Sequence, residues 1–148
     1  MKEFILRSEQ TIDRPIDEVF EFFSDPHNLG EITPPFLGFR VLSCSTPAIC
    51  KGSLIDYKIR LRGLPLRWRS LISAFEPPFR FVDEQVRGPY RRWVHEHTFE
   101  DRNGKTLVRD EVRYAVLGGA LINRLLVRKD LQVIFDYRSR RLTELLGP

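Results

Sequence analysis

Six segments typical of β-strands follow one another between Phe36 and Leu117, and this succession limits the possible folds more than any other feature. Turn-forming residues separate the segments, and Asn103-Gly104 is the strongest of these signals because both residues tolerate positive φ. Short links join antiparallel neighbours and are too short for a parallel crossover. The sequence therefore predicts an antiparallel meander of Phe36–Leu42, Ser53–Arg62, Leu66–Phe75, Arg80–Arg87, Arg91–Glu100 and Thr106–Leu117.

The segments that flank this meander complete the predicted architecture. Phe4–Ile12 alternates and is expected to be a first strand. Pro15 and Pro26 each mark the first residue of a short helix, and Asp25 can cap the second. The longest element is a helix from Ala120 to Leu146, with charged residues opposite an apolar face that comprises Val127, Leu131, Ile134, Phe135, Leu142, Leu145 and Leu146.

An α+β fold of the helix-grip type satisfies the burial needs of all these elements. In this fold a curved seven-stranded antiparallel sheet wraps around the long C-terminal helix, and two short helices lie between the first and second strands. A bent sheet cannot touch a straight helix along its whole length, so we expect a cavity between them. The chain has 148 residues, 42% of them hydrophobic, which fits one domain spanning residues 1–148 with enough core to fold without disulfide or metal.

The composition, and the absence of membrane, export and nucleic-acid-binding signals, indicate where the protein is located and which classes of partner it has. The sequence contains no membrane span and no export signal, and Cys44 and Cys50 match no zinc or redox motif, so we expect a cytoplasmic protein with reduced thiols. The net charge of +4 comes largely from dispersed arginines. The basic segment from Arg60 to Arg69 is interpreted as a solvated strand face, and no specific nucleic-acid partner is expected, because no recognition motif accompanies it.

The opening of the chain carries a resemblance to a known superfamily. Thr11–Leu29, with the run Ile12-Asp13-Arg14-Pro15-Ile16-Asp17-Glu18-Val19-Phe20, resembles the first strand and paired helices of the START-like (SRPBCC) superfamily. Ile32-Thr33-Pro34-Pro35, Arg87-Gly88-Pro89-Tyr90, Trp93-x-His95-x-His97-x-Phe99 and Arg109–Tyr114 look like a bacterial ligand-binding subgroup. The resemblance includes polyketide cyclase/dehydrase-type proteins, and it implies a helix-grip fold that hosts carriers, receptors and a minority of enzymes.

Strand alternation predicts which side chains face the cavity. On the sixth strand Trp93, His95, His97 and Phe99 share one face, and on the last strand Asp110 and Tyr114 share the inward face with valines. The choice for the fifth strand is close to even, and we favour the face that carries Phe81, Asp83, Gln85 and Arg87. Arg138 lies on the apolar face of the terminal helix, from which its guanidinium can reach Asp110 or an acid of the ligand. The predicted ligand-binding residues are Tyr57, Trp68, Asp83, Gln85, Trp93, His95, His97, Asp110, Tyr114 and Arg138.

Three interpretations apply to His95 and His97 with Asp83 and Asp110. The favoured one is a hydrogen-bonded polar wall of the cavity. The second is a catalytic His–Asp pair, in which the carboxylate orients an imidazole that acts as general base; His95, His97 and Asp110 are its candidate catalytic residues. The third is metal ligation by His-x-His and a carboxylate, but spacing marks no third ligand, so no metal and no cofactor are expected.

These observations predict a protein that binds a small apolar or amphipathic molecule, of lipid, polyketide or aromatic type, between the sheet and the terminal helix. Aromatic side chains, Tyr90 among them, would suit a ring-bearing ligand. An alternative is an enzyme of cyclase, dehydratase or hydrolase character that uses the same cavity. A further alternative is a protein-interaction module or homodimer seam, because the terminal helix carries a second apolar stripe of Ile122, Leu126, Val133 and Tyr137.

Overall fold

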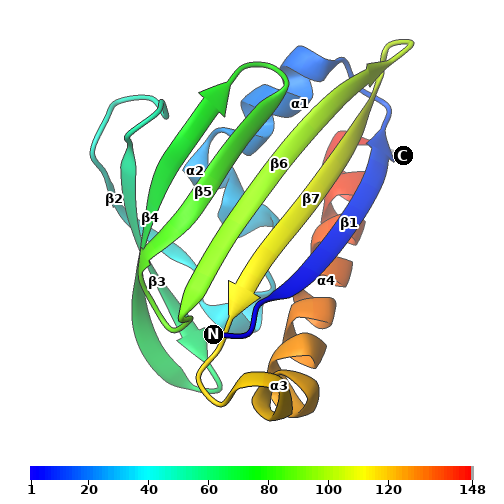
Figure 1. Cartoon of the computed structure of the whole chain (residues 1–148). Helices are drawn as coiled ribbons and strands as arrows, with labels where there is room; N and C mark the ends of the chain where they lie inside the picture. Colours follow the sequence, from blue (N-terminus) through cyan, green and yellow to red (C-terminus); the bar gives the residue numbers. More distant parts are fainter. Residues whose placement is uncertain (148) are drawn as a thin grey trace.

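The protein consists of one curved sheet that wraps around a long helix (Figure 1). The structure is a computed structural model and describes residues 1–147. The sheet contains seven antiparallel strands in the order β1-β7-β6-β5-β4-β3-β2. The strands are β1 (Phe4–Ile12), β2 (Arg40–Cys44), β3 (Leu54–Leu61), β4 (Leu64–Glu76), β5 (Arg80–Arg87), β6 (Arg92–Arg102) and β7 (Lys105–Ala115).

Helices fill the concave side of the sheet. Between β1 and β2 the chain forms α1 (Ile16–Phe23), α2 (Pro26–Leu29), η1 (Gly30–Ile32) and η2 (Pro35–Leu37). The expected cap is present, because Asp25 Oδ1 accepts a hydrogen bond from the backbone N–H of His27 at 3.0 Å. The C-terminal helical region consists of α3 (Gly119–Ile122), a π-helical turn η3 (Asn123–Val127) and α4 (Arg128–Leu146). The helix-grip prediction is therefore confirmed.

Two strands begin more than one residue away from the position predicted from the sequence. The segment at Phe36 forms the helical turn η2, and β2 begins only at Arg40, because the amides of Leu37 and Gly38 donate back to the carbonyls of Pro34 and Pro35 and Gly38 adopts a positive φ. The β3–β4 hairpin closes through Arg62 and Gly63, both at positive φ, and the strand resumes at Leu64. A two-residue turn of this kind matches the twist of the strands better than the longer turn predicted at 63–65.

The core divides into two clusters along the helix. One contains Ile12, Val19, Phe20 and Leu142, where α1 and the end of α4 cover the sheet. The other contains Val112, Tyr114, Leu131 and Phe135, where the start of α4 lies on β7. The predicted apolar face of α4 is buried at Leu131, Phe135 and Leu142, whereas Leu145 is exposed. Within residues 1–147 no helix is long and apolar enough to cross a membrane.

Candidate functional site

A cavity lies between the concave face of the sheet and α4, where the sequence predicted one. Its volume is about 190 Å³, which is below the roughly 300–1,000 Å³ of sites for drug-sized ligands. The lining is mainly apolar and comes from the helical segments between β1 and β2, from four strands (β3, β4, β5 and β6) and from α4. A small molecule with mostly apolar surface therefore fits it best.

One side of the cavity is aromatic. The rings of Trp68 and Trp93 meet edge to face with centroids 5.4 Å apart, and Tyr57 stacks on Trp68 at 5.9 Å. Ser70 lies 2.9 Å from the hydroxyl of Tyr57 and accepts from the indole N–H of Trp68 at 3.0 Å. Because Ser70 satisfies these polar atoms, the rings present mainly apolar surface to a ligand.

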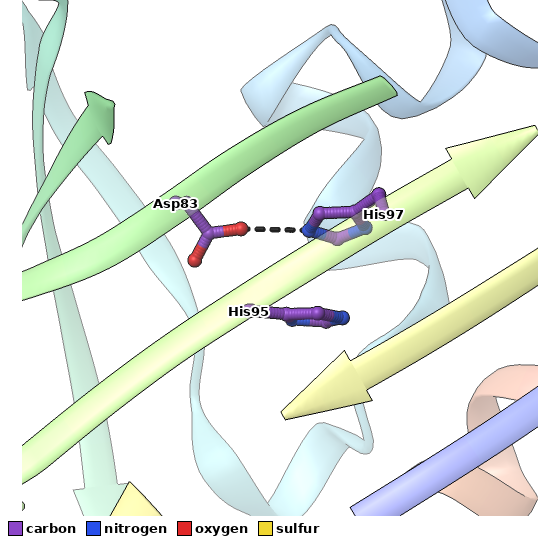
Figure 2. A group of neighbouring side chains, drawn as sticks. All are labelled: Asp83, His95 and His97. Carbon is purple, nitrogen blue, oxygen red and sulfur yellow. Dashed lines mark hydrogen bonds and ion pairs between the residues drawn. The ribbon is translucent and has the colours of Figure 1, made fainter. Parts of the chain in front are cut away.

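A buried charge cluster forms the other side. His95 and His97 project from the same face of β6 with their rings stacked at 3.7 Å. Figure 2 shows His97 pointing toward Asp83 of β5, and His97 Nε2 lies 2.7 Å from Asp83 Oδ2. The second carboxylate, Asp110 of β7, lies opposite His97 in the strand register, and its Oδ1 is 2.8 Å from His95 Nε2.

The terminal helix completes this cluster with a cation. Arg138 Nη2 donates to Asp110 Oδ1 at 2.9 Å, and the side chains of both residues are less than one tenth exposed. The guanidinium carbon also lies 5.2 Å from the ring centroid of Phe23 and 5.5 Å from that of Phe135. Two aromatic rings and one carboxylate therefore hold the cation in place, which a buried charge requires.

The two histidines differ in protonation because they differ in neighbours. Burial opposes the charged form of His97, but the carboxylates of Asp110 and Asp83 outweigh burial and raise its pKa. Burial and the adjacent His97 lower the pKa of His95 despite its hydrogen bond to Asp110. Burial would raise the pKa of Asp110, yet Arg138 and the histidines hold it well below its usual range. The cluster thus favours a proton on His97 rather than on His95.

The ionised form is also favoured at Asp83, which lines the cavity. Burial raises the pKa of this carboxyl, but the hydrogen bond from His97 and the charges of His95, His97 and Arg138 lower it overall. Oδ2 of Asp83 is engaged by His97, and within residues 1–147 its Oδ1 has no hydrogen-bond donor, so Oδ1 is left for a ligand in the cavity. A carboxylate without its full set of donors in an apolar cavity selects a group that donates a hydrogen bond.

Asp83, His95 and His97 each offer a ligand atom within 4.8 Å of the others, so a metal has to be considered. Stacking at 3.7 Å keeps the ring planes nearly parallel, and in-plane lone pairs of parallel rings do not converge on one point. His95 and His97 each already contact a carboxylate through Nε2. The observed arrangement fits a hydrogen-bonded cluster, and a metal would require both rings to turn.

The structure brings seven of the ten expected residues to the cavity. Three do not line it. The amide oxygen and nitrogen of Gln85 both bond the backbone of Tyr90. Asp110 is bonded to His95 and Arg138, and Tyr114 donates to buried Asn123 at 2.7 Å. The seven that line it are Tyr57, Trp68, Asp83, Trp93, His95, His97 and Arg138.

The inward face predicted for the fifth strand, β5, is correct for the first half of the strand only. Phe81 and Asp83 face the cavity, whereas Arg87 is exposed opposite Arg69. An extra residue on β5 between Gln85 and Arg87 shifts the register and ends the alternation. No local sequence signal marks this β-bulge.

Several lining residues were not among the ten predicted ligand-binding residues, although the predicted inward face of the fifth strand included Phe81. Phe81 stacks on His97 at 4.1 Å, Phe23 of α1 covers Arg138, and Phe135 of α4 lies 5.8 Å from the ring of His95. Phe81 shares the strand face of Asp83, and Phe135 belongs to the predicted apolar face of the helix. The side-chain periodicity of a strand and of a helix is therefore enough to identify both as lining residues.

Comparisons with known proteins agree with this architecture. The model of the family described as polyketide cyclase/dehydrase and lipid transport matches residues 12–139. A protein from Chromobacterium violaceum has 14% identity and a TM-score of 0.77, with 98% of this chain and 99% of that chain covered. No curated protein matches the chain by sequence.

Two further solved structures share the fold and carry descriptive names. The Zhui aromatase/cyclase from a Streptomyces species has 13% identity and a TM-score of 0.74, covering 95% of this chain and 92% of that one. Major latex-like protein 151 from Panax ginseng has 16% identity and a TM-score of 0.74, covering 99% of both chains. Since the family model spans most of the sequence, the chain belongs to the polyketide cyclase/dehydrase and lipid transport family.

Proposed function

We propose that this protein binds a small apolar or amphipathic molecule that donates a hydrogen bond to Asp83. The observation that carries the proposal is the apolar, aromatic-lined cavity of about 190 Å³ with an ionised carboxylate in its wall. Aromatic rings supply contact area, and Asp83 orients a hydroxyl, phenol or amine. A ligand carboxylate is disfavoured there, because two like charges in a poorly hydrated site repel.

The two tryptophans provide the assay. The chain has only Trp68 and Trp93, and both line the cavity, so a change of intrinsic fluorescence reports its occupation. Titration with 1-octanol and with octanoate compares two apolar chains of equal length that end in a donor and in an anion. We expect 1-octanol to bind at least about tenfold more tightly, because one hydrogen bond to a charged group contributes about 1.5–3 kcal/mol.

Asp83→Asn is the matched variant, since it keeps the shape and removes the charge. We expect the preference for 1-octanol over octanoate to shrink in this variant. Absence of any fluorescence response to both compounds would refute ligand binding itself. An unchanged preference in Asp83→Asn would refute the role of Asp83 alone.

A second candidate is an enzyme of cyclase, dehydratase or hydrolase character in the same cavity, with His95 or His97 working with Asp83 or Asp110. The observation that favours it is His97, whose raised pKa and contact with Asp83 suit proton transfer. In a dehydration, the carboxylate of Asp83 would take a proton from the carbon next to a carbonyl. Protonated His97 would donate its proton to the departing hydroxyl, which would leave as water. A substrate whose turnover is lost in His97→Gln while its binding is retained would establish this function over simple carriage.

A further inference from the structure

Charge is segregated along the length of the sheet. The antiparallel order places the starts of β1, β4 and β6 and the ends of β3, β5 and β7 at one end, together with α3 (Figure 1). We define the basic end as residues 1–4, 60–64, 87–92 and 116–130. It carries nine basic and two acidic side chains, namely Lys2, Arg60, Arg62, Arg87, Arg91, Arg92, Arg124, Arg128 and Lys129 against Glu3 and Asp130.

The opposite end has the reverse sign. It contains the β1–α1 connection, α1, the β2–β3 connection, the β4–β5 turn, the β6–β7 hairpin and the end of α4, which are residues 13–25, 45–53, 76–80, 100–105 and 143–146. These segments carry nine acidic and five basic side chains. A chain with a net charge of only +4 is thus strongly dipolar, and an anionic surface would orient it with the basic end forward.

Exposed leucines accompany the bases at the same end. Leu121 and Leu125, one helical turn apart, are each more than half exposed, and so are Leu117 just before the helix and Leu64 after the β3–β4 turn. The bases of the same helical segment, Arg124, Arg128 and Lys129, are exposed and form no ion pair within residues 1–147. Leucines beside unpaired bases on one helical segment are typical of a surface that lies in a lipid headgroup layer.

The β3–β4 hairpin and the helix are joined into one platform. Arg62 Nη2 donates to both carboxylate oxygens of Asp130, at 3.0 and 3.1 Å. This bidentate pair holds the hairpin tip, and with it Leu64, beside the start of α4. Leucines from two elements are therefore presented together rather than on separate mobile loops.

We propose that the basic end is a docking surface for an anionic lipid bilayer. The bases contact lipid phosphates, and Leu64, Leu117, Leu121 and Leu125 enter the headgroup region. A nucleic acid offers phosphates but no apolar layer for exposed leucines, so the combination favours lipid. Leu61 and Tyr90, which line the cavity, come from the segments of this end, so the docked protein holds that part of its cavity near the membrane.

Cosedimentation with vesicles tests the proposal on the whole chain. Phosphatidylcholine vesicles are compared with vesicles in which about a third of the lipid is phosphatidylglycerol, at low and at high salt. We expect binding to the anionic vesicles at low salt, weakened by high salt. Removing three bases in Arg124→Gln/Arg128→Gln/Lys129→Gln should weaken binding about a hundredfold, because each base contributes about a factor of five near such a surface.

Two further variants separate the contribution of the bases to vesicle binding from that of the leucines. Arg14→Gln/Arg102→Gln/Lys105→Gln removes the same charge from the acidic end and should bind nearly as the parent does. Leu121→Ser/Leu125→Ser keeps every charge and should weaken binding at least tenfold, because it removes two inserted side chains. Circular dichroism shows whether each variant keeps its fold.

The alternatives have distinct outcomes. Failure to bind anionic vesicles, equal binding to neutral ones, or equal losses in both charge triples would overturn the proposal. If the Leu121→Ser/Leu125→Ser variant converts a dimer into a monomer and vesicles bind neither form, the surface is a contact between two copies. Binding to an oligonucleotide but not to vesicles would assign it to nucleic acid.

Discussion

Replacing Asp110 by Asn tests the charge cluster most directly. The carboxylate is 7% exposed, and its Oδ1 receives Arg138 and His95 within 2.9 Å. Asn keeps the shape and one acceptor but leaves the buried guanidinium of Arg138 without its ion-pair partner. Breaking a buried ion pair in this way costs about 3–5 kcal/mol, and we expect about 3 kcal/mol because the acceptor remains.

The assay is urea unfolding followed by circular dichroism, with a thermal melt as a second measure. A loss of about 3 kcal/mol lowers the melting temperature of a chain of this size by about 6–12 °C. Glu111→Gln is the matched control on the same strand, because Glu111 pairs with exposed Arg7 and Arg113. A surface pair of this kind contributes at most about 1 kcal/mol.

A double variant separates the cost of leaving the Arg138 guanidinium unpaired from the other effects of Asp110→Asn. Asp110→Asn/Arg138→Met removes the guanidinium together with the carboxylate, so it should be more stable than Asp110→Asn alone. A loss below about 1 kcal/mol in Asp110→Asn would refute the argued cost of an unpaired buried charge. A double variant whose loss equals the sum of the single losses would refute the coupling.

Three smaller perturbations follow from the same structure. Folding raises the pKa of His97, so protonated His97 stabilises the folded protein. This stabilisation is fully present below about pH 6.5, the pKa of an unfolded histidine, and is lost as the pH rises through the folded pKa. In His97→Asn the urea midpoint should therefore no longer fall for this reason between pH 6 and pH 9. Gly118→Ala should lower the free energy of unfolding by about 2 kcal/mol, because φ is +89° and the added carbon meets a side chain of the following helix. Gly119→Ala should lower it by only about 1 kcal/mol, because φ is +59° but the added carbon has free space. Equal losses of stability in the two variants would contradict the steric explanation. Tyr114→Phe should cost about 1–3 kcal/mol by leaving the buried oxygen of Asn123 without its donor, and a neutral melt would refute that bond.

Local patterns predicted the architecture because each depends on neighbours in the chain. Asn103 and Gly104 adopt positive φ in the hairpin turn, as their residue types indicate. The alternation along β6 placed His95 and His97 on the inward face correctly. The β-bulge near Arg87 could not be predicted, because an extra residue on one strand is tolerated by the twist of the sheet rather than dictated by local residues.

The sequence by itself determined the order of the strands, the helix that they enclose and the inward positions of the two histidines, since side-chain period and turn chemistry act over a few residues. Only the tertiary structure decided that His97 contacts Asp83 while His95 and Arg138 share Asp110, because strand register and the placement of α4 set those distances. The same is true of the charged ends. Basic residues dispersed along the chain gather at one end because antiparallel strands bring their alternate turns together.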